Sequence, residues 1–111
     1  NPASTATLPL LRGSQPTHLV LAHKVNIERI QHFPEFTIPP IQKVIDLYQT
    51  VATAGGTFAS PNLAGIALNT FGVDEDEARK AILNISQTTG LPCTDVIRFS
   101  SAPILDAILK A

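Results

Sequence analysis

The clearest pattern along the chain is an uncharged apolar run from Leu63 to Leu68, which ends in the polar pair Asn69 and Thr70. Such a run is typical of a strand buried on both faces of a parallel sheet, and it lacks the alternation of a strand with one face in water. Ligands of open α/β sheets bind beyond the carboxyl ends of the strands. Asn69 therefore lies where a binding site is expected.

Two further segments predict strands. Thr17–Ala22 is too apolar for an edge strand that faces water, and it leads into a second polar cluster that contains His23 and Lys24. Leu91–Phe99 predicts a third strand, weakened at its start by Pro92. The first two strands thus both end in polar side chains.

The strongest helical pattern begins after Pro39 and Pro40. Apolar residues recur there with i, i+3, i+4, i+7 spacing from Ile41 to Ala52, and Gly55 and Gly56 end the helix. Residues 26–38 show no steady period, so we expect a long loop that packs through its aromatic side chains.

Three more helices complete the pattern. Asp74 and Glu77 form a capping box, and Gly90 ends the helix that they begin. Ser100 or Ser101 caps a last helix, whose inward-facing residues we expect to be Ile104, Leu105, Ile108 and Leu109. The first helix is predicted at residues 3–12, with Thr7 as a cap, Pro9 in its first turn and Gly13 as its end.

Strands that alternate with helices indicate right-handed βαβ crossovers. The predicted fold class is therefore α/β: a three-layer arrangement with a parallel sheet of about three strands and flanking helices. With 111 residues, the chain is expected to form a single domain over residues 1–111.

Composition narrows the function classes. The net charge is −1, and acidic and basic residues are mixed along the chain, so the sequence does not predict a basic surface that would bind nucleic acid or an anionic membrane. The apolar runs are shorter than a membrane span, and the single cysteine, Cys93, fits a reducing compartment, so we expect a cytoplasmic protein. The absence of methionine leads us to interpret the chain as a piece of a longer polypeptide.

Seven segments, in this order, resemble one bacterial family of unknown-function proteins, and together they span almost the whole chain. They are Pro2–Ser4, Leu10–Pro16, Leu19–His23, Pro39–Pro40, Gly65–Thr70, Glu77–Arg79 and Thr89–Pro92. The family has a P-loop-NTPase-like carboxyl-terminal domain and is also described as D-glutamate N-acetyltransferase-like. The resemblance implies that this chain is the back half of the P-loop domain. The phosphate-binding loop would then lie upstream, and no Gly-x-x-x-x-Gly-Lys-Ser/Thr motif occurs here.

A more distant similarity is to the dethiobiotin-synthetase-like branch of P-loop proteins. That branch has a strand ending in Asn, then a helix, then a Gly-x-Pro strand, and the segments Gly65–Asn69 and Gly90–Pro92 look similar. Because the branch uses this Asn to bind the nucleotide base, the resemblance implies the same role for Asn69. The resemblance to the unknown-function family places Ser4, Thr5 and Thr7 at the end of a glycine-rich, phosphate-near segment, although a capped helix start explains them equally well.

The candidate site residues each have two interpretations. The carboxamide of Asn69, with Thr70, offers a donor and an acceptor for a purine edge, or else only satisfies the backbone at the turn. His23, as a proton carrier and catalytic base, and Lys24 could meet an anionic substrate or a cofactor phosphate, or else form a solvated loop pair. Cys93 is interpreted as a small buried hydrophobe, and the spacing of His, Cys and acidic residues predicts no metal site.

Two classes of function remain open. In the first, the parent protein is an acyltransferase that uses acetyl-CoA to acetylate a small-molecule D-amino acid, with an ATP- and Mg²⁺-dependent ligase of the dethiobiotin synthetase type as its rival. In the second, the piece is non-catalytic and serves as a structural or oligomerisation fragment. The expected partners are the missing N-terminal part of the same protein and a second copy of the chain, since a lone three-stranded sheet exposes its edges.

Overall fold

The computed structural model describes residues 6–30 and 32–110, which fall into two compact units. One unit contains the described residues of the ranges 18–26 and 62–111, and it holds the parallel sheet. The other contains those of the ranges 1–17 and 27–61.

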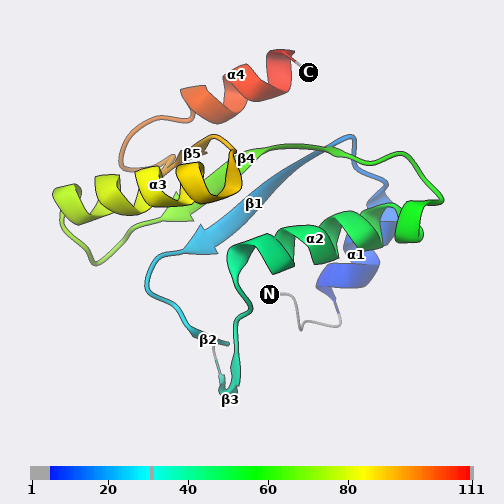
Figure 1. Ribbon diagram of the computed structural model, residues 1–111, viewed down its shortest axis with the longest axis horizontal. Coiled ribbons are helices and arrows are strands. Elements are labelled where there is room, and N and C mark those ends of the chain that lie inside the picture. The colour runs from blue at the N-terminus through cyan, green and yellow to red at the C-terminus, as the bar shows by residue number, and fades with distance from the viewer. Residues whose placement is uncertain (1–5, 31, 111) are drawn as a thin grey trace. The chain divides into compact units, whose positions relative to one another are not determined.

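The first unit is built on a parallel sheet of three strands. The strands β1 (His18–Lys24), β4 (Asn62–Asn69) and β5 (Cys93–Thr94) lie in the order β1-β4-β5, and both pairings are parallel (Figure 1). Helices α3 (Glu75–Thr89) and α4 (Ala102–Lys110) flank this sheet. The predicted α/β class and the parallel sheet with flanking helices are thus confirmed.

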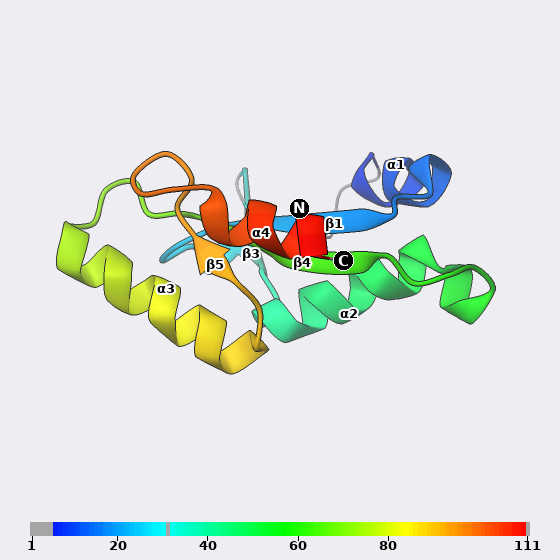
Figure 2. The same ribbon diagram turned by 90° about the horizontal axis from the view of Figure 1, so that it is seen from above.

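The core of this unit lies along β4. Ile66 and Leu68 are fully buried, as the unbroken apolar run predicted. Helix α4 packs on β4 (Figure 2) through a close approach at Gly65. A Cβ at Gly65 would lie 2.7 Å from the carbonyl oxygen of Pro92 and 3.0 Å from Cγ1 of Ile104. Glycine therefore lets β5 and α4 come this close to β4.

Helix α3 begins and ends at the predicted residues. The Asp74 carboxylate accepts a hydrogen bond of 2.8 Å from the backbone N–H of Glu77, which satisfies one of the free donors at the helix start. Gly90 takes a left-handed conformation with φ of 71°, which ends the helix.

Two predictions for the end of the chain are corrected. The third strand does not extend to Phe99: it ends at Thr94, because the Asp95 carboxylate accepts backbone N–H groups of Ile97 and Arg98 and turns the chain. In α4, Ile104 is buried, whereas Leu105 and Leu109 are 50% and 73% exposed rather than facing inward. At the start of α4, the Ser100 hydroxyl accepts a hydrogen bond of 3.0 Å from the backbone N–H of Ala102, the first helical residue.

The second unit contains α1 (Thr7–Ser14), β2 (Arg29–Ile30), β3 (Phe33–Thr37), α2 (Ile41–Ala52) and the 3₁₀ turn η1 (Ala54–Gly56). Helix α2 follows Pro40 as predicted. The expected long loop at residues 26–38 is wrong, because β2 and β3 pair as antiparallel strands. The aromatic residues Phe33 and Phe36 of β3 are 55% and 57% exposed.

Helix α1 differs from its prediction at both ends. Its N-cap is Ala6, without a side-chain capping bond, so Thr7 is the first helical residue rather than the cap. Gln15 takes the left-handed conformation that ends the helix, and Gly13 lies inside it. Pro9 does fall in the first turn, where its missing N–H has no intrahelical partner to lose. No helix among the described residues is long and apolar enough to cross a membrane.

Candidate functional site at the carboxyl end of the sheet

Strands β1 and β4 end side by side and bring two of the predicted site residues together. Lys24 and Asn69 are paired in the parallel register, and both are exposed. The backbone N–H of Val25 donates to the carbonyl oxygen of Asn69 at 3.0 Å, so the pairing continues past the end of β1. Lys24 and Asn69 therefore occupy neighbouring positions at the carboxyl end of the sheet, where α/β proteins bind ligands.

The Asn69 side chain forms a tight turn with its own chain. Its Oδ1 accepts a hydrogen bond of 2.9 Å from the backbone N–H of Phe71, which is the backbone-satisfying role considered from the sequence. An amide oxygen has two lone pairs, and the Nδ2 group makes no hydrogen bond within residues 6–30 and 32–110. The turn therefore fixes the direction of the amide and leaves a donor and an acceptor position for a ligand.

Thr70 is held inside the protein. It is completely buried, its backbone N–H donates to Asp95 Oδ2 at 3.0 Å, and its hydroxyl donates to the same oxygen at 2.5 Å. Thr70 does not face solvent, because its side chain is completely buried and its hydroxyl donates to Asp95, and its role in cofactor binding stays a prediction.

Asp95 is the residue of this region that the sequence analysis did not single out. Its two carboxylate oxygens accept four hydrogen bonds: two from Thr70, and one each from the backbone N–H groups of Ile97 and Arg98 at 3.0 and 3.1 Å. Burial on its own raises the pKa of Asp95, but the Thr70 hydroxyl and the three backbone N–H groups lower it, and the resulting pKa is about 2. Asp95 is thus a buried, ionised carboxylate at neutral pH.

A signal for Asp95 was present in the sequence. Thr94 and Asp95 follow the apolar Cys93 as Asn69 and Thr70 follow Leu68, so both strands end in a polar pair. The predicted strand Leu91–Phe99 continues past this pair and so places Asp95 in the interior of a strand.

His23 lies on the other face of the sheet from Lys24. Side chains alternate along a strand, and His23 is paired with the buried Leu68, whereas Lys24 is paired with Asn69. His23 is half-buried, and this burial lowers its pKa. The predicted pair His23 and Lys24 is therefore split, and the role of His23 as a catalytic base stays a prediction.

The remaining candidates are placed as follows. Ser4 lies outside the described residues. Cys93 is buried, and burial raises the pKa of its thiol to about 11, which agrees with the interpretation as a small hydrophobic residue. Within the part of the chain that the structure describes, no three His, Cys, Asp or Glu side chains are arranged to hold a metal ion.

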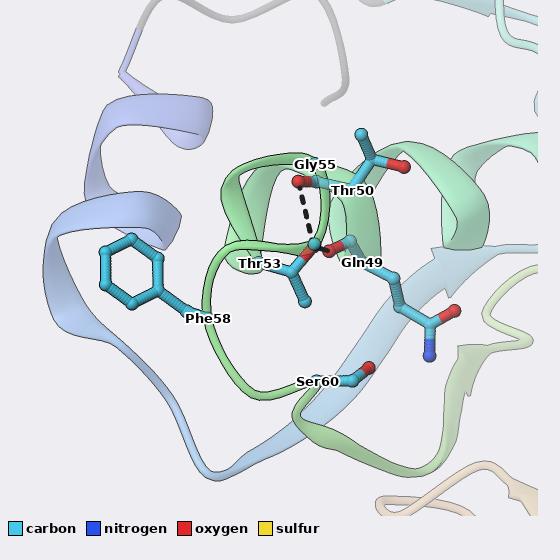
Figure 3. A pocket seen from close by; sticks show the side chains of 7 residues that line it. Gln49, Thr50, Thr53, Gly55, Phe58 and Ser60 are labelled. Carbon is cyan, nitrogen blue, oxygen red and sulfur yellow. Dashed lines mark hydrogen bonds between the residues drawn. The ribbon is translucent and has the colours of Figure 1, made fainter.

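The second unit has a hollow at the end of α2 (Figure 3). It is lined by Gln49, Thr50, Thr53, Gly55, Gly56, Phe58 and Ser60. The Thr53 hydroxyl donates to the carbonyl oxygens of Gln49 and Thr50, as Figure 3 shows, and the guanidinium of Arg12 stacks on the Phe58 ring at 4.1 Å. Among the described residues, none that was predicted to form the site lines this hollow.

Comparisons with known proteins place the chain among P-loop domains. A family model described as a domain of unknown function (DUF1611_C), P-loop domain, matches residues 1–105. A crystal structure of a DUF1611 family protein from Anabaena variabilis is similar over the whole chain, with 50% identity and a TM-score of 0.93. This chain covers 32% of the Anabaena protein.

Two curated relatives carry the name D-glutamate N-acetyltransferase. The one from Pseudoalteromonas is 34% identical over 92 residues, which is 83% of this chain and 27% of the relative. The one from Tritonibacter scottomollicae is 26% identical over 105 residues, which is 95% of this chain and 31% of the relative. The chain thus spans less than a third of the length of either relative.

Proposed function

From the premise that this chain belongs to the DUF1611 family of P-loop domains, we propose that it forms the nucleotide-contacting part of an N-acetyltransferase acting on D-glutamate. The two relatives with that name support the activity. The single observation that carries the proposal is the pairing of Lys24 with Asn69 at the carboxyl edge of the sheet.

The two side chains fit the nucleotide part of acetyl-CoA. The exposed ammonium of Lys24 is suited to a phosphate group, and the carboxamide of Asn69, already oriented by Phe71, is suited to the edge of adenine. In this proposal, the amine nitrogen of D-glutamate attacks the thioester carbonyl, the carbon–sulfur bond breaks, the amine loses a proton and CoA leaves as a thiol. Within this chain, Lys24 and Asn69 hold the cofactor.

The experiment is calorimetric titration of acetyl-CoA, and separately of Mg-ATP, into the native protein and its variants. Asn69→Ala and Lys24→Ala should each weaken acetyl-CoA binding by about tenfold, which corresponds to one hydrogen bond or charge contact. Asn84→Ala and Lys80→Ala are matched controls, because Asn84 and Lys80 are the same residue types exposed on α3. These two should bind like the wild type.

A second assay follows D-glutamate-dependent release of CoA. Release with D-glutamate, reduced in Asn69→Ala and unchanged in Asn84→Ala, would support the acetyltransferase. Binding of Mg-ATP in place of acetyl-CoA would instead favour the ligase considered from the sequence. Binding of neither would contradict the proposal and leave a structural role.

A further inference from the structure

The loops after β4 and β5 are joined by a buried carboxylate. Asp95 Oδ2 accepts both donors of Thr70, which directly follows β4, while Oδ1 accepts the N–H groups of Ile97 and Arg98 in its own loop. Both side chains are buried, with Thr70 at 0% and Asp95 at 6% exposure. Bonds to an ionised acceptor are stronger than those between neutral groups, and low exposure protects them from competing water.

A second contact joins the same two loops. The guanidinium of Arg98 donates to the carbonyl oxygen of Val73 at 2.9 Å, and the N–H of Val73 donates to the carbonyl oxygen of Thr70 at 3.3 Å. Residues 70–73 are therefore held to the loop of Asp95 at Thr70 and at Val73.

Asn69 lies between these contacts and β1. Its carbonyl oxygen accepts from Val25, its neighbour Thr70 is bound to Asp95, and its side-chain oxygen accepts from Phe71. The backbone on both sides of Asn69 is thus fixed, one side by β1 and the other by Asp95. The exposed amide of Asn69 thus lies on a backbone segment that is hydrogen-bonded on both sides.

We propose that Asp95 is a positioning residue, which holds Thr70 and thereby orients the Asn69 carboxamide toward the bound nucleotide. This inference rests on the proposed function, in which Asn69 contacts the cofactor, and adds a residue that does not itself touch the ligand. Both carboxylate oxygens of Asp95 already accept hydrogen bonds from Thr70 or from backbone N–H groups. Asp95 therefore acts only through the turn that it holds.

The test has a readout that needs no ligand. In the native protein, hydrogen exchange of the Phe71 amide reports whether the Asn69 turn is closed. Asp95→Asn keeps the shape of the side chain but places an NH₂ group where an acceptor is needed. It should speed exchange at Phe71 by tenfold or more. Asp106→Asn, an exposed acid on α4, is the matched control and should leave exchange unchanged.

The second readout is acetyl-CoA affinity in a double-mutant cycle. Asp95→Asn should weaken binding several-fold in the wild-type background and have no further effect in the Asn69→Ala background, because Asp95 acts through Asn69. A purely structural role would weaken binding equally in both backgrounds, and that result would overturn the proposal.

Two further outcomes are decisive. Where Asp95→Asn fails to fold, Thr70→Val replaces it, because this variant removes only the hydroxyl donor and keeps the backbone N–H bond; it should give the same pattern with a smaller effect. Unchanged exchange at Phe71 in a folded variant would overturn the inference. A wild type that does not bind acetyl-CoA would refute the proposed function, while the exchange measurement would still decide the role of Asp95.

Discussion

The hydroxyl of Thr70 donates a hydrogen bond of 2.5 Å to the carboxylate of Asp95, although 25 positions separate the two residues in the chain. Neither residue lies within a strand, yet each directly follows one: Thr70 follows β4 and Asp95 follows β5. Because the two strands are parallel and adjacent, their carboxyl ends meet at the same edge. The bond therefore joins the loop that follows β4, next to Asn69, to the loop that follows β5.

Acid should remove the contribution of Asp95 to stability. Its pKa is about 2 in the folded protein and has an ordinary value of 3.8. A carboxylate with a lowered pKa contributes its full stabilisation at every pH above the ordinary pKa of 3.8. This contribution to the free energy of unfolding, about 2 kcal/mol, is lost as the pH falls from 3.8 through about 2. Urea unfolding of the wild type and Asp95→Asn at a series of pH values measures the loss.

The difference in unfolding free energy between these two proteins should shrink as the pH falls through this window. Asp106→Asn, with its exposed side chain, serves as the control for a general loss of negative charge. A difference between the wild type and Asp95→Asn that is the same at pH 7 and at pH 2 would contradict the assignment.

Gly65→Ala should destabilise the protein by about 1–3 kcal/mol, the usual cost of overpacking a core. The added Cβ would lie 2.7 Å from a backbone oxygen, that of Pro92, and could be relieved only if β5 moved away from β4. Thermal unfolding measures the effect. Gly13→Ala is the matched control, because nothing lies within 4 Å of its Cβ and the residue is helical, so its stability should stay equal or rise. Equal melting temperatures for Gly65→Ala and the wild type would refute the close approach.

His23 should titrate below its ordinary pKa of 6.5, because burial penalises the imidazolium. NMR titration of its ring protons should give a midpoint below 6.5. Above pH 6.5, His23 is neutral in both the folded and the unfolded protein and does not affect stability. As the pH falls from 6.5 toward the folded pKa, the unfolded chain takes up a proton more readily than the folded protein, so the free energy of unfolding decreases. A midpoint above 6.5 would show that a carboxylate or another acceptor faces the ring.

Cys93 should resist thiol reagents in the folded protein. With a pKa of about 11 rather than 9.0, its thiolate population at pH 8 falls by roughly a hundredfold, and burial further limits access. Labelling with a disulfide reagent should be slow in buffer and fast in urea, and Cys93→Ser should show none. Rapid labelling of the native protein would mean that β5 is open to solvent.

The sequence pointed to two residues that the structure brings together, and it missed the hydrogen-bonded framework around them. It identified Asn69 and Lys24 as polar residues after buried strands, and these two are neighbours in the register. It grouped His23 with Lys24, although adjacent residues of a strand point to opposite faces. It missed Asp95, because the apolar residues Val96 and Ile97 extend the predicted strand beyond the polar pair Thr94 and Asp95, where β5 in fact ends.

Local patterns in the sequence determined the elements: the apolar run of β4, the cap at Asp74 and the stripe of α2 act over a few residues and need no distant partner. Only the tertiary structure decided where β5 ends, that Arg29–Ile30 pairs with Phe33–Thr37, and that Thr70 meets Asp95. Each of these features depends on a contact between residues far apart in the chain or on the hydrogen bonds of a single carboxylate. Neither produces a periodic pattern of apolar and polar residues, so the sequence pattern does not predict them.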